Sequence, residues 1–183
     1  GQTKLQIEML LVWYSRLKSM RYASLRYFNA AGYDPEGEIR GLEREPNNLL
    51  PIVLEAIVGK RRGVEVFGND YETEDGSCIR DYIHVTDLAD AHIKALKYLE
   101  KEDRDLLVNL GTSKGLSVFQ ILETARRVSG VEFPVTVGPR RKGDPAVVLS
   151  SAEKAEKLLG WDPRFSSAET LLETMLVAYR DRG

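Results

Sequence analysis

The stretch ASLRYFNAAG, residues 23–32, decides the fold class of this chain. Its Leu, Tyr and Phe side chains make residues 23–29 typical of a β-strand, and the small residues at 30–32 end that strand before a polar loop at 33–46. Upstream, residues 4–20 carry apolar side chains at helical spacing on two sides, which predicts a helix with two apolar faces. A helix that leads into such a strand indicates an α/β fold.

Strands and helices continue to alternate after this stretch, which favours the same class. Short strands are expected at residues 64–67, 78–85, 106–111 and 135–138. Helices are expected at residues 48–59, 86–99, 117–130, 152–159 and 166–180. The N-terminal caps expected for four of these helices are Asn48, Thr86, Ser117 with Gln120, and Ser166 with Glu169.

The composition limits the classes of function. The chain has 183 residues, and 26 Lys and Arg against 28 Asp and Glu give a formal net charge of −2. A nucleic-acid binder normally carries an excess of cations, so nucleic acid is not an expected partner. The longest apolar run, residues 9–14, is far shorter than the ~20 residues of a membrane span, and no membrane association is expected. A single cysteine, Cys78, predicts no disulfide and a cytoplasmic location.

Sequence motifs for metals and for dinucleotide phosphates are missing. His84 and His92 are the two histidines, and with Cys78 they lack the spacing of metal ligands. The chain contains no G-x-G-x-x-G run and no P-loop. If a dinucleotide is bound, its phosphate-binding turn is therefore expected outside this chain.

Three polar positions each have a functional and a purely local interpretation. Lys4 either pairs with Glu8 one helical turn on or, if a tyrosine precedes the chain, lowers the pKa of that tyrosine for general-base work. Asn29 is either a turn former or a ligand-binding residue at the carboxyl edge of the sheet. Asn47 and Asn48 either only cap the next helix or present donors to an anion or a sugar hydroxyl.

Two runs supply arginines. Residues 80–85, RDYIHV, place polar groups alternately along a strand, with Arg80 on one side and Asp81 on the other; a structural Arg–Asp ion pair is the alternative to a binding role. Residues 140–145, RRKGDP, form a basic turn in which Arg141 offers a planar fork suited to phosphate, although such a turn can be merely solvated. Two separated arginines suffice for one diphosphate, because each charge-assisted contact contributes about 1.5–3 kcal/mol.

Taken together and in order, nine runs resemble the carboxyl-terminal half of one family. They are GQTK at 1–4, LRYFNAAG at 25–32, NNLLP at 47–51, FGNDY at 67–71, TEDG at 73–76, RDYIHV at 80–85, NLG at 109–111, RRKGD at 140–144 and LGW at 159–161. The family is that of the UDP-galactose (UDP-glucose) 4-epimerases, which are extended short-chain dehydrogenases/reductases. The resemblance covers essentially the whole chain.

The resemblance implies a fold and an activity. Residues 1–31, with a returning strand near 106–111, would be the end of an NAD-binding Rossmann domain, and residues 32–183 would be mainly a smaller α/β nucleotide-sugar-binding domain. The implied activity is interconversion of UDP-galactose and UDP-glucose through a 4-keto intermediate with bound NAD, in a homodimer formed through the 4–20 helix. The implied start of the chain is just after the catalytic tyrosine, so the chain alone is expected to be inactive.

The alternatives lie inside and outside this reaction class. Nucleotide-sugar dehydratases and decarboxylases are related enzymes, but dehydratases usually carry R-x-x-N-x-Y-G-P, whereas residues 26–33 read RYFNAAGY and resemble an epimerase. A non-catalytic module that binds UDP or only dimerises is the alternative outside catalysis.

The resemblance also implies individual roles. Lys4 would be the lysine of a Y-x-x-x-K pair and would contact the cofactor together with Tyr27 and Phe28. The residues implied in UDP-sugar binding are Asn29, Asn47 and Asn48 for the nucleotide sugar, Leu49 and Phe67 beside the uracil, Arg80 and Arg141 for the diphosphate, and Asp144 for the ribose. Val148 would lie beside the second carbon of the sugar and set the room for an N-acetyl group, unless residues 147–149 are only an apolar strand.

Overall fold

The computed structural model describes residues 1–39 and 41–180 of the chain. Its helices are α1 (Gln2–Lys18), α2 (Leu49–Ile57), α3 (Val85–Glu102), α4 (Val118–Ser129), α5 (Glu153–Leu159) and α6 (Ala168–Arg180). Its strands are β1 (Ala23–Tyr27), β2 (Asn29–Ala31), β3 (Val64–Phe67), β4 (Ile79–Arg80), β5 (Tyr82–His84), β6 (Leu106–Leu110), β7 (Leu116–Ser117), β8 (Val135–Gly138) and β9 (Val147–Val148). The predicted α/β class is confirmed.

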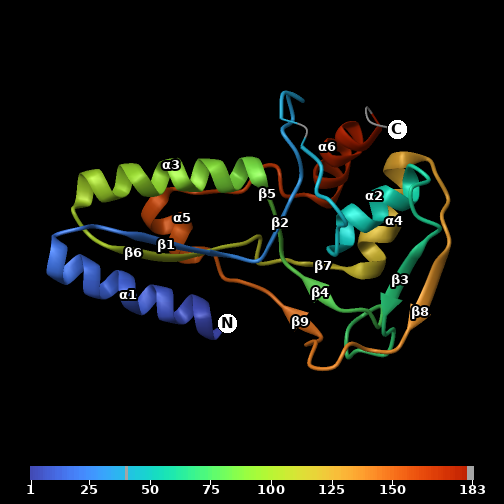
Figure 1. The fold of residues 1–183 in the computed structure, drawn as a ribbon, viewed down its shortest axis with the longest axis horizontal. Helices are drawn as coiled ribbons and strands as arrows, with labels where there is room; N and C mark the ends of the chain where they lie inside the picture. The colour runs from blue at the N-terminus through green and yellow to red at the C-terminus, as the bar shows by residue number, and fades with distance from the viewer. Residues whose placement is uncertain (40, 181–183) are drawn as a thin grey trace.

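One end of the molecule is built on the parallel pair of β1 and β6 (Figure 1). Helices α1 and α3 cover opposite faces of this pair. Alternation along β1 turns Leu25 toward α3, where it packs against a buried cluster with Ala91, Ala95 and Val108. Trp161, which follows α5, completes that cluster and donates its indole N–H to the Asp87 carbonyl at 2.9 Å.

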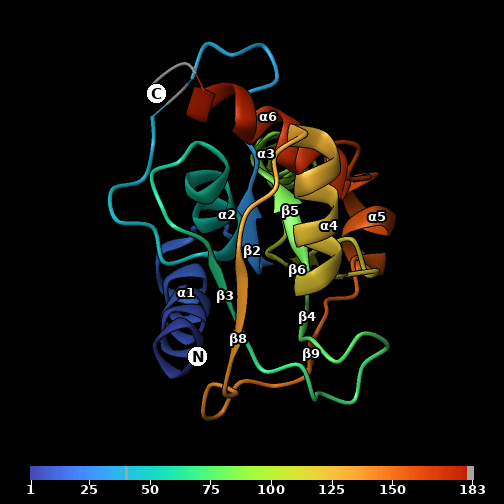
Figure 2. The same cartoon turned by 90° about the vertical axis from the view of Figure 1, so that its right-hand side faces the viewer.

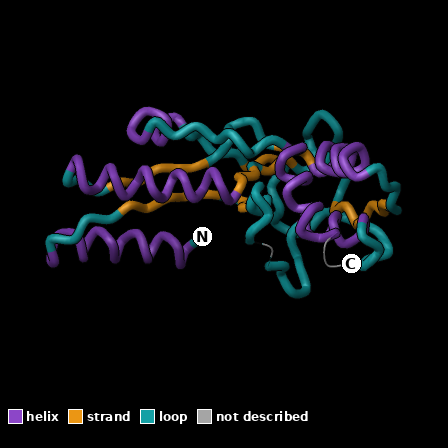
Figure 3. The backbone as a smooth tube through the Cα atoms, turned by 90° about the horizontal axis from the view of Figure 1, so that it is seen from above, coloured by secondary structure: helices purple, strands orange, loops and turns teal. Residues whose placement is uncertain are grey.

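The other end, which faces the viewer in Figure 2, carries the larger of the two buried clusters. Strands β3 and β8 pair in parallel, and α2, α4 and α6 pack together around Val53, Leu54, Ile121, Leu171 and Leu172, each at most 2% exposed. Figure 3 shows the two long helices at one end, the shorter ones mostly at the other, and loops between them. The boundary predicted near residue 31 stays a prediction, although α3 and α5 pack with the β1–β6 pair.

The middle of the molecule is where the chain changes sheets. The single strand expected at 23–29 is two strands, because β1 pairs with β6 whereas β2 pairs with β5. The single strand expected at 78–85 is also two, since β4 lies between β7 and β9. Asp81 separates β4 from β5; its amide donates to the Val148 carbonyl at 3.2 Å, and its carbonyl accepts from the Asn29 amide at 3.3 Å. Its main chain therefore bridges two sheets.

Of the four expected helix caps, two positions are confirmed and two were wrong; Asn48 is the N-cap residue of α2, although its side chain makes no capping hydrogen bond. Ser117 and Gln120 form the expected capping box of α4, and Gly130 ends that helix. Thr86 is not a cap, because α3 begins one residue earlier and its N-cap is His84, whose side chain accepts from the Thr86 amide at 3.1 Å.

Ser166 is not a cap either. Ser167 is the residue just before α6, and its hydroxyl accepts from the Thr170 amide at 3.1 Å. The Ser166 hydroxyl instead donates to the buried Asp87 carboxylate at 2.6 Å. No described helix is long and apolar enough to cross a membrane.

Candidate active site

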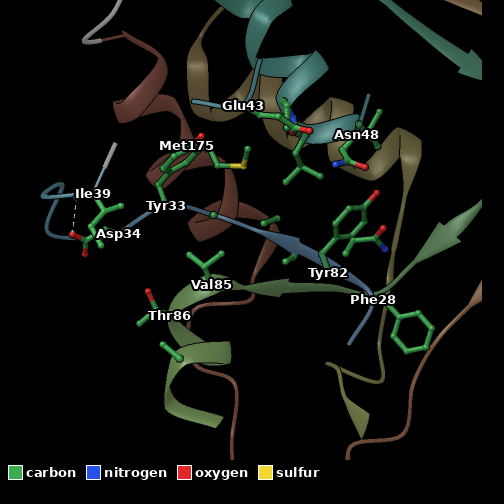
Figure 4. A pocket seen from close by; sticks show the side chains of 18 residues that line it. Phe28, Tyr33, Asp34, Ile39, Glu43, Asn48, Tyr82, Val85, Thr86 and Met175 are labelled. Atoms are coloured by element: carbon green, nitrogen blue, oxygen red, sulfur yellow. Dashed lines mark hydrogen bonds between the residues drawn. The ribbon is translucent and has the colours of Figure 1, made fainter. Parts of the chain in front are cut away.

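Two cavities meet at Phe28 and Asn29, where the chain passes from β1 to β2. The α1–β1 cavity, of about 790 Å³, lies between α1 and β1 and extends to Arg80 and Val148. The α2–α3 cavity, of about 750 Å³, lies between β2 and the first turns of α2 and α3 (Figure 4). Both open at the carboxyl end of β1, the end at which α/β sheets bind ligands.

The α1–β1 cavity brings together six of the residues selected from the sequence. They are Lys4, Tyr27, Phe28, Asn29, Arg80 and Val148. The local interpretation of Lys4 as a partner of Glu8 is wrong, because the Glu8 carboxylate is bonded by Arg26 and Ser24 instead. No described residue pairs with or hydrogen-bonds the Lys4 ammonium, so this cation faces the cavity without a counter-ion.

Asp81 holds two of these residues in place. Its carboxylate is fully buried and accepts from both the amide and the hydroxyl of Thr112, at 2.9 and 2.8 Å, and from the amide and hydroxyl of Ser150, at 3.2 and 3.1 Å. Its carbonyl accepts from Asn29 Nδ2 at 2.7 Å, while its amide binds the Val148 carbonyl. The Asn29 amide group is thereby oriented, with its own oxygen left for another donor.

Gly111 shows how tightly this arrangement is packed. A Cβ at Gly111 would lie 1.6 Å from the Ser150 hydroxyl oxygen and 2.4 Å from an Asp81 carboxylate oxygen. The NLG run at 109–111 therefore has a physical reason for its glycine, because Asp81 and Ser150 occupy the space of a side chain.

Arg80 does form a structural ion pair, but its partner is Asp144. The guanidinium donates from Nη2 to the Asp144 carboxylate and from Nη1 to the Ile79 carbonyl at 2.7 Å. The second Nη1 hydrogen points to the Ala146 carbonyl at 3.5 Å, so Nε and one Nη2 hydrogen are left for an anion. The Arg80 side chain is 14% exposed, so the charge lies in a partly desolvated position, where charge-assisted bonds are strong.

The basic turn at 140–145 is held by stacking on aromatic rings. The Arg141 guanidinium carbon lies 3.9 Å from the centre of the Phe67 ring, and that of Arg140 lies 4.3 Å from the centre of the Tyr71 ring. Arg140 Nε also donates to Asp70 at 2.7 Å. A stacked guanidinium keeps its donor edge free, so Arg141 is available to an anion.

Of the other predicted residues, the α2–α3 cavity contains only Asn48 and Leu49; Phe67, Arg141 and Asp144 line neither cavity. Asn48 lies at the N-cap position of α2 without a capping hydrogen bond from its side chain, and both Asn48 and Leu49 line this cavity (Figure 4). Asn47 is exposed and lines neither cavity. Tyr82 also lines this cavity, although no role was assigned to it from the sequence. Burial holds the pKa of its phenol well above the ordinary value. Its place in the RDYIHV run was the available signal.

His84 packs behind Gly32, one of the residues that line the α2–α3 cavity. The imidazole is fully buried; its Nδ1 accepts from the Thr86 amide, and its Nε2 lies 3.1 Å from the Thr174 hydroxyl. Burial lowers the pKa of His84, which keeps the ring neutral, as the Nδ1 acceptor requires. Gly32 has φ +83°, and a Cβ there would lie 2.2 Å from the His84 ring, so only glycine fits.

The described residues contain no group of three or more His, Cys, Asp or Glu side chains placed to hold a metal ion. The α1–β1 cavity is lined by three cations, the Asn29 amide, two aromatic rings and the Glu8 carboxylate, whereas the α2–α3 cavity is lined by amides, aromatic and apolar side chains and the carboxyl groups of Asp34 and Glu43. That set of groups suits a phosphorylated, hydroxyl-rich ligand beside a flat heteroaromatic one.

Several known proteins are similar to this chain over nearly its whole length. A curated UDP-glucose 4-epimerase of Halalkalibacterium halodurans is 49% identical over 173 residues, which are 94% of this chain and 52% of that protein. A crystal structure of a UDP-glucose 4-epimerase superposes with a TM-score of 0.96 at 44% identity, over 100% of this chain and 55% of that one. The enzyme of Stenotrophomonas maltophila, solved with NAD and formylated UDP-arabinopyranose, gives 0.94 at 37% identity, over 99% and 54%.

The chain thus spans about half the length of the curated relatives it matches. A family model described as the NAD dependent epimerase/dehydratase family matches residues 1–111. That match contains α1, the β1–β6 pair and the polar side chains at its carboxyl end, from Lys4 to Asp81. This chain therefore belongs to the NAD dependent epimerase/dehydratase family.

Proposed function

We propose that the intact gene product containing this chain is a UDP-glucose 4-epimerase, which interconverts UDP-galactose and UDP-glucose with NAD. The observation that carries the proposal is the convergence of Lys4, Asn29 and Arg80 on one cavity, with a lone ammonium near one end and a half-buried guanidinium near the other. A sugar nucleotide needs cationic groups at its diphosphate and a proton-handling group at its sugar, and this cavity offers both.

The residues near β1 fit the nicotinamide end of NAD. Tyr27 and Phe28 are large aromatic side chains that are left 41% and 43% exposed at the carboxyl end of β1, and both line the cavity with Lys4. Flat aromatic faces and one cation suit a ring and a ribose hydroxyl. NAD, when bound, supplies the acceptor and donor of hydride for the fourth carbon of the sugar.

Lys4 is proposed to act on a tyrosine four positions earlier, before Gly1. Two side chains at that spacing share one face of a helix, and an ammonium beside a phenol favours the phenolate. The unpaired state of Lys4 supports this role, because a counter-ion on the ammonium would cancel the field that lowers the tyrosine's pKa. The tyrosine can then accept the proton of the sugar 4-hydroxyl.

The substrate side is assigned by chemistry. Arg80 and Arg141 are proposed to bind the diphosphate, with Asp144 accepting from the ribose after exchanging part of its pairing with Arg80. Asn29, Asn47 and Asn48 are proposed to bond the nucleotide sugar, and Leu49 and Phe67 to border the uracil. Asn29, Asn48, Leu49 and Arg80 each line a cavity, whereas Asn47, Phe67, Arg141 and Asp144 line neither, so the proposed roles of these four rest on the resemblance and on the contacts given above.

A homodimer through α1 is proposed on the basis of its surface. Large apolar side chains along this helix are about half exposed or more, namely Leu5, Ile7, Met9, Leu10, Trp13, Tyr14 and Leu17. An apolar surface of this extent is typical of an interface.

A cytoplasmic location is proposed from the single, unpaired Cys78, since reducing compartments keep thiols free.

The test of the proposed function is turnover by the intact gene product. We expect UDP-galactose to be converted to UDP-glucose without net consumption of NAD, and Lys4→Met to abolish turnover while UDP still binds in calorimetry. Loss of water from the sugar would indicate a dehydratase, and release of carbon dioxide from a UDP-uronic acid a decarboxylase. Binding of UDP with no turnover of any of these sugars would leave only a binding module.

A further inference from the structure

A three-residue cluster lies beside Lys4 in the α1–β1 cavity. The Glu8 carboxylate on α1 accepts from Arg26 Nε at 2.6 Å, from Arg26 Nη2, and from the Ser24 hydroxyl at 3.0 Å. Arg26 and Ser24 lie two residues apart on β1, so they share the face that is turned toward α1. The fork-like pair saturates one edge of Glu8, and the hydrogen bond from Arg26 is the main reason that the pKa of this carboxyl is lowered.

Lys4 and Glu8 lie four residues apart on α1, and both line the same cavity. At this spacing a lysine and a glutamate on one helix face attract each other. The charged side chains that line the cavity with Lys4 are Glu8, Arg26 and Arg80. Glu8 is thus the one anionic side chain there, and Arg26 already occupies it.

We propose that Arg26 is a positioning residue for Lys4: by engaging the Glu8 carboxylate, it prevents an ion pair between Glu8 and Lys4 and keeps the Lys4 ammonium free toward the reacting centre. The catalytic consequence rests on the proposed function of Lys4, whereas the choice of ion-pair partner does not. Without Arg26, Glu8 would turn to Lys4, the cation one turn away on the same helix. The ammonium would then be drawn along the helix and its charge neutralised.

Arg26 is not the only residue that ties α1 to the rest of the molecule. The Ser15 hydroxyl donates to Asp105 at 2.6 Å and ties the helix to the start of β6, while Ser24 still reaches Glu8. Removing the guanidinium therefore changes the electrostatics near Lys4 more than the location of the helix. This separation makes the proposal distinguishable from a merely structural role.

Kinetics of Arg26→Met in the intact gene product provide the first test. We expect kcat to fall roughly fivefold or more, because a carboxylate next to the ammonium opposes its field at short range, with the affinity for UDP unchanged in calorimetry. The double variant Arg26→Met with Glu8→Gln should regain most of kcat, since glutamine can still accept from Ser24 but cannot capture Lys4. Arg21→Met is the matched control. It removes an arginine–carboxylate pair outside the cavity, that of Arg21 Nε with Asp103 at 2.8 Å, and should leave kcat unchanged.

A fall in kcat that Glu8→Gln does not rescue would overturn the proposal, as would an unchanged kcat in Arg26→Met or an equal loss in the Arg21 control. A second readout does not need turnover. Lysines methylated with ¹³C are followed by NMR, with Lys4 assigned by its loss in Lys4→Arg. Its pKa should rise in Arg26→Met and return in the double variant. An unchanged Lys4 pKa in Arg26→Met refutes the proposal even if the protein catalyses another reaction, and an inactive wild type with the expected NMR shifts refutes the proposed function alone.

Discussion

Enlarging Val148 gives a sharp test of substrate width. Val148 lies on β9 and lines the α1–β1 cavity together with Lys4, Phe28 and Asn29. A valine leaves room that a phenol ring would fill, so the proposed enzyme should accept 2-acetamido sugars as well as the unacetylated pair. Val148→Tyr should then depress kcat/KM for UDP-N-acetylglucosamine and UDP-N-acetylgalactosamine selectively.

The magnitude follows from how firmly the main chain is held at this position. Val148 is paired with Arg80 in the β4–β9 ladder, and its carbonyl accepts from the Asp81 amide at 3.2 Å. The strand cannot retreat without breaking these bonds, so the added ring must project into the cavity. Overfilling a site of this kind costs about 1–3 kcal/mol, which is a loss of about 5- to 150-fold in kcat/KM for the acetylated pair.

Val147→Tyr is the matched control. Val147 is the other residue of β9, is 46% exposed, and lines neither cavity, because alternation turns it to the opposite face. The assay compares kcat/KM for the four UDP-sugars in wild type and both variants, at saturating NAD. The reasoning fails if wild type does not turn over the acetylated sugars, if Val148→Tyr slows both pairs equally, or if the Val147 variant shows the same selectivity.

Three further predictions test other parts of the site. Arg80→Ala or Arg141→Ala should weaken UDP binding about tenfold or more, since each removes a charge-assisted contact, while single-turnover rates at saturating substrate stay within about threefold; the opposite pattern would contradict a diphosphate role. Burial lowers the pKa of His84 in the folded state, so its contribution to stability should be complete above about pH 6.5, the unfolded value, and should be lost as pH falls through the folded pKa. Thermal denaturation measured against pH checks this, and an identical pH profile in His84→Asn would contradict it. Leu10→Glu with Tyr14→Glu should dissociate the proposed dimer in sedimentation, and an intact dimer would move the interface away from α1.

Local patterns predicted much of the fold. The capping box at Ser117, the glycine ends at Gly130 and Gly160, and the strands β3, β6 and β8 agree with expectation, because each depends on residues close in sequence. The errors came where distant residues decide. Thr86 has the chemistry of an N-cap, but the buried His84 is held by Thr174, 90 residues away, and takes that position.

The strand breaks at Phe28 and Asp81 have the same origin. Residues 23–29 and 78–85 are rich in strand-forming side chains, and both were expected to be continuous, although Asp81 itself is a residue type that strands disfavour. Asp81 leaves β4 because its carboxylate is buried among Thr112 and Ser150, which come 31 and 69 residues later. A buried carboxylate without such partners would be costly, so their arrangement determines where the strand ends.

The candidate site could be assembled from sequence because its residues were chosen by order and type. Lys4, Tyr27 and Phe28 line one cavity with Asn29, while their roles stay predictions. What the sequence did not predict was the pairing inside that cavity. Lys4 with Glu8 is the obvious pair on a helix, yet the structure joins Glu8 to Arg26 across two elements.

The two unexpected strand breaks, at Phe28 and at Asp81, explain how the site is arranged. At Phe28 and at Asp81 the chain leaves one sheet for another, and the Asn29 side chain crosses to the Asp81 carbonyl at that point. Polar side chains can collect there because main-chain groups at a strand end are not all used by a ladder and can orient them. Lys4, Arg80 and Val148 come from three different elements to this one place. A ligand that binds there contacts residues of β1 as well as of β4 and β9, so a substitution at Asp81 should disturb binding at Asn29 and at Val148 together, although its side chain lines neither cavity.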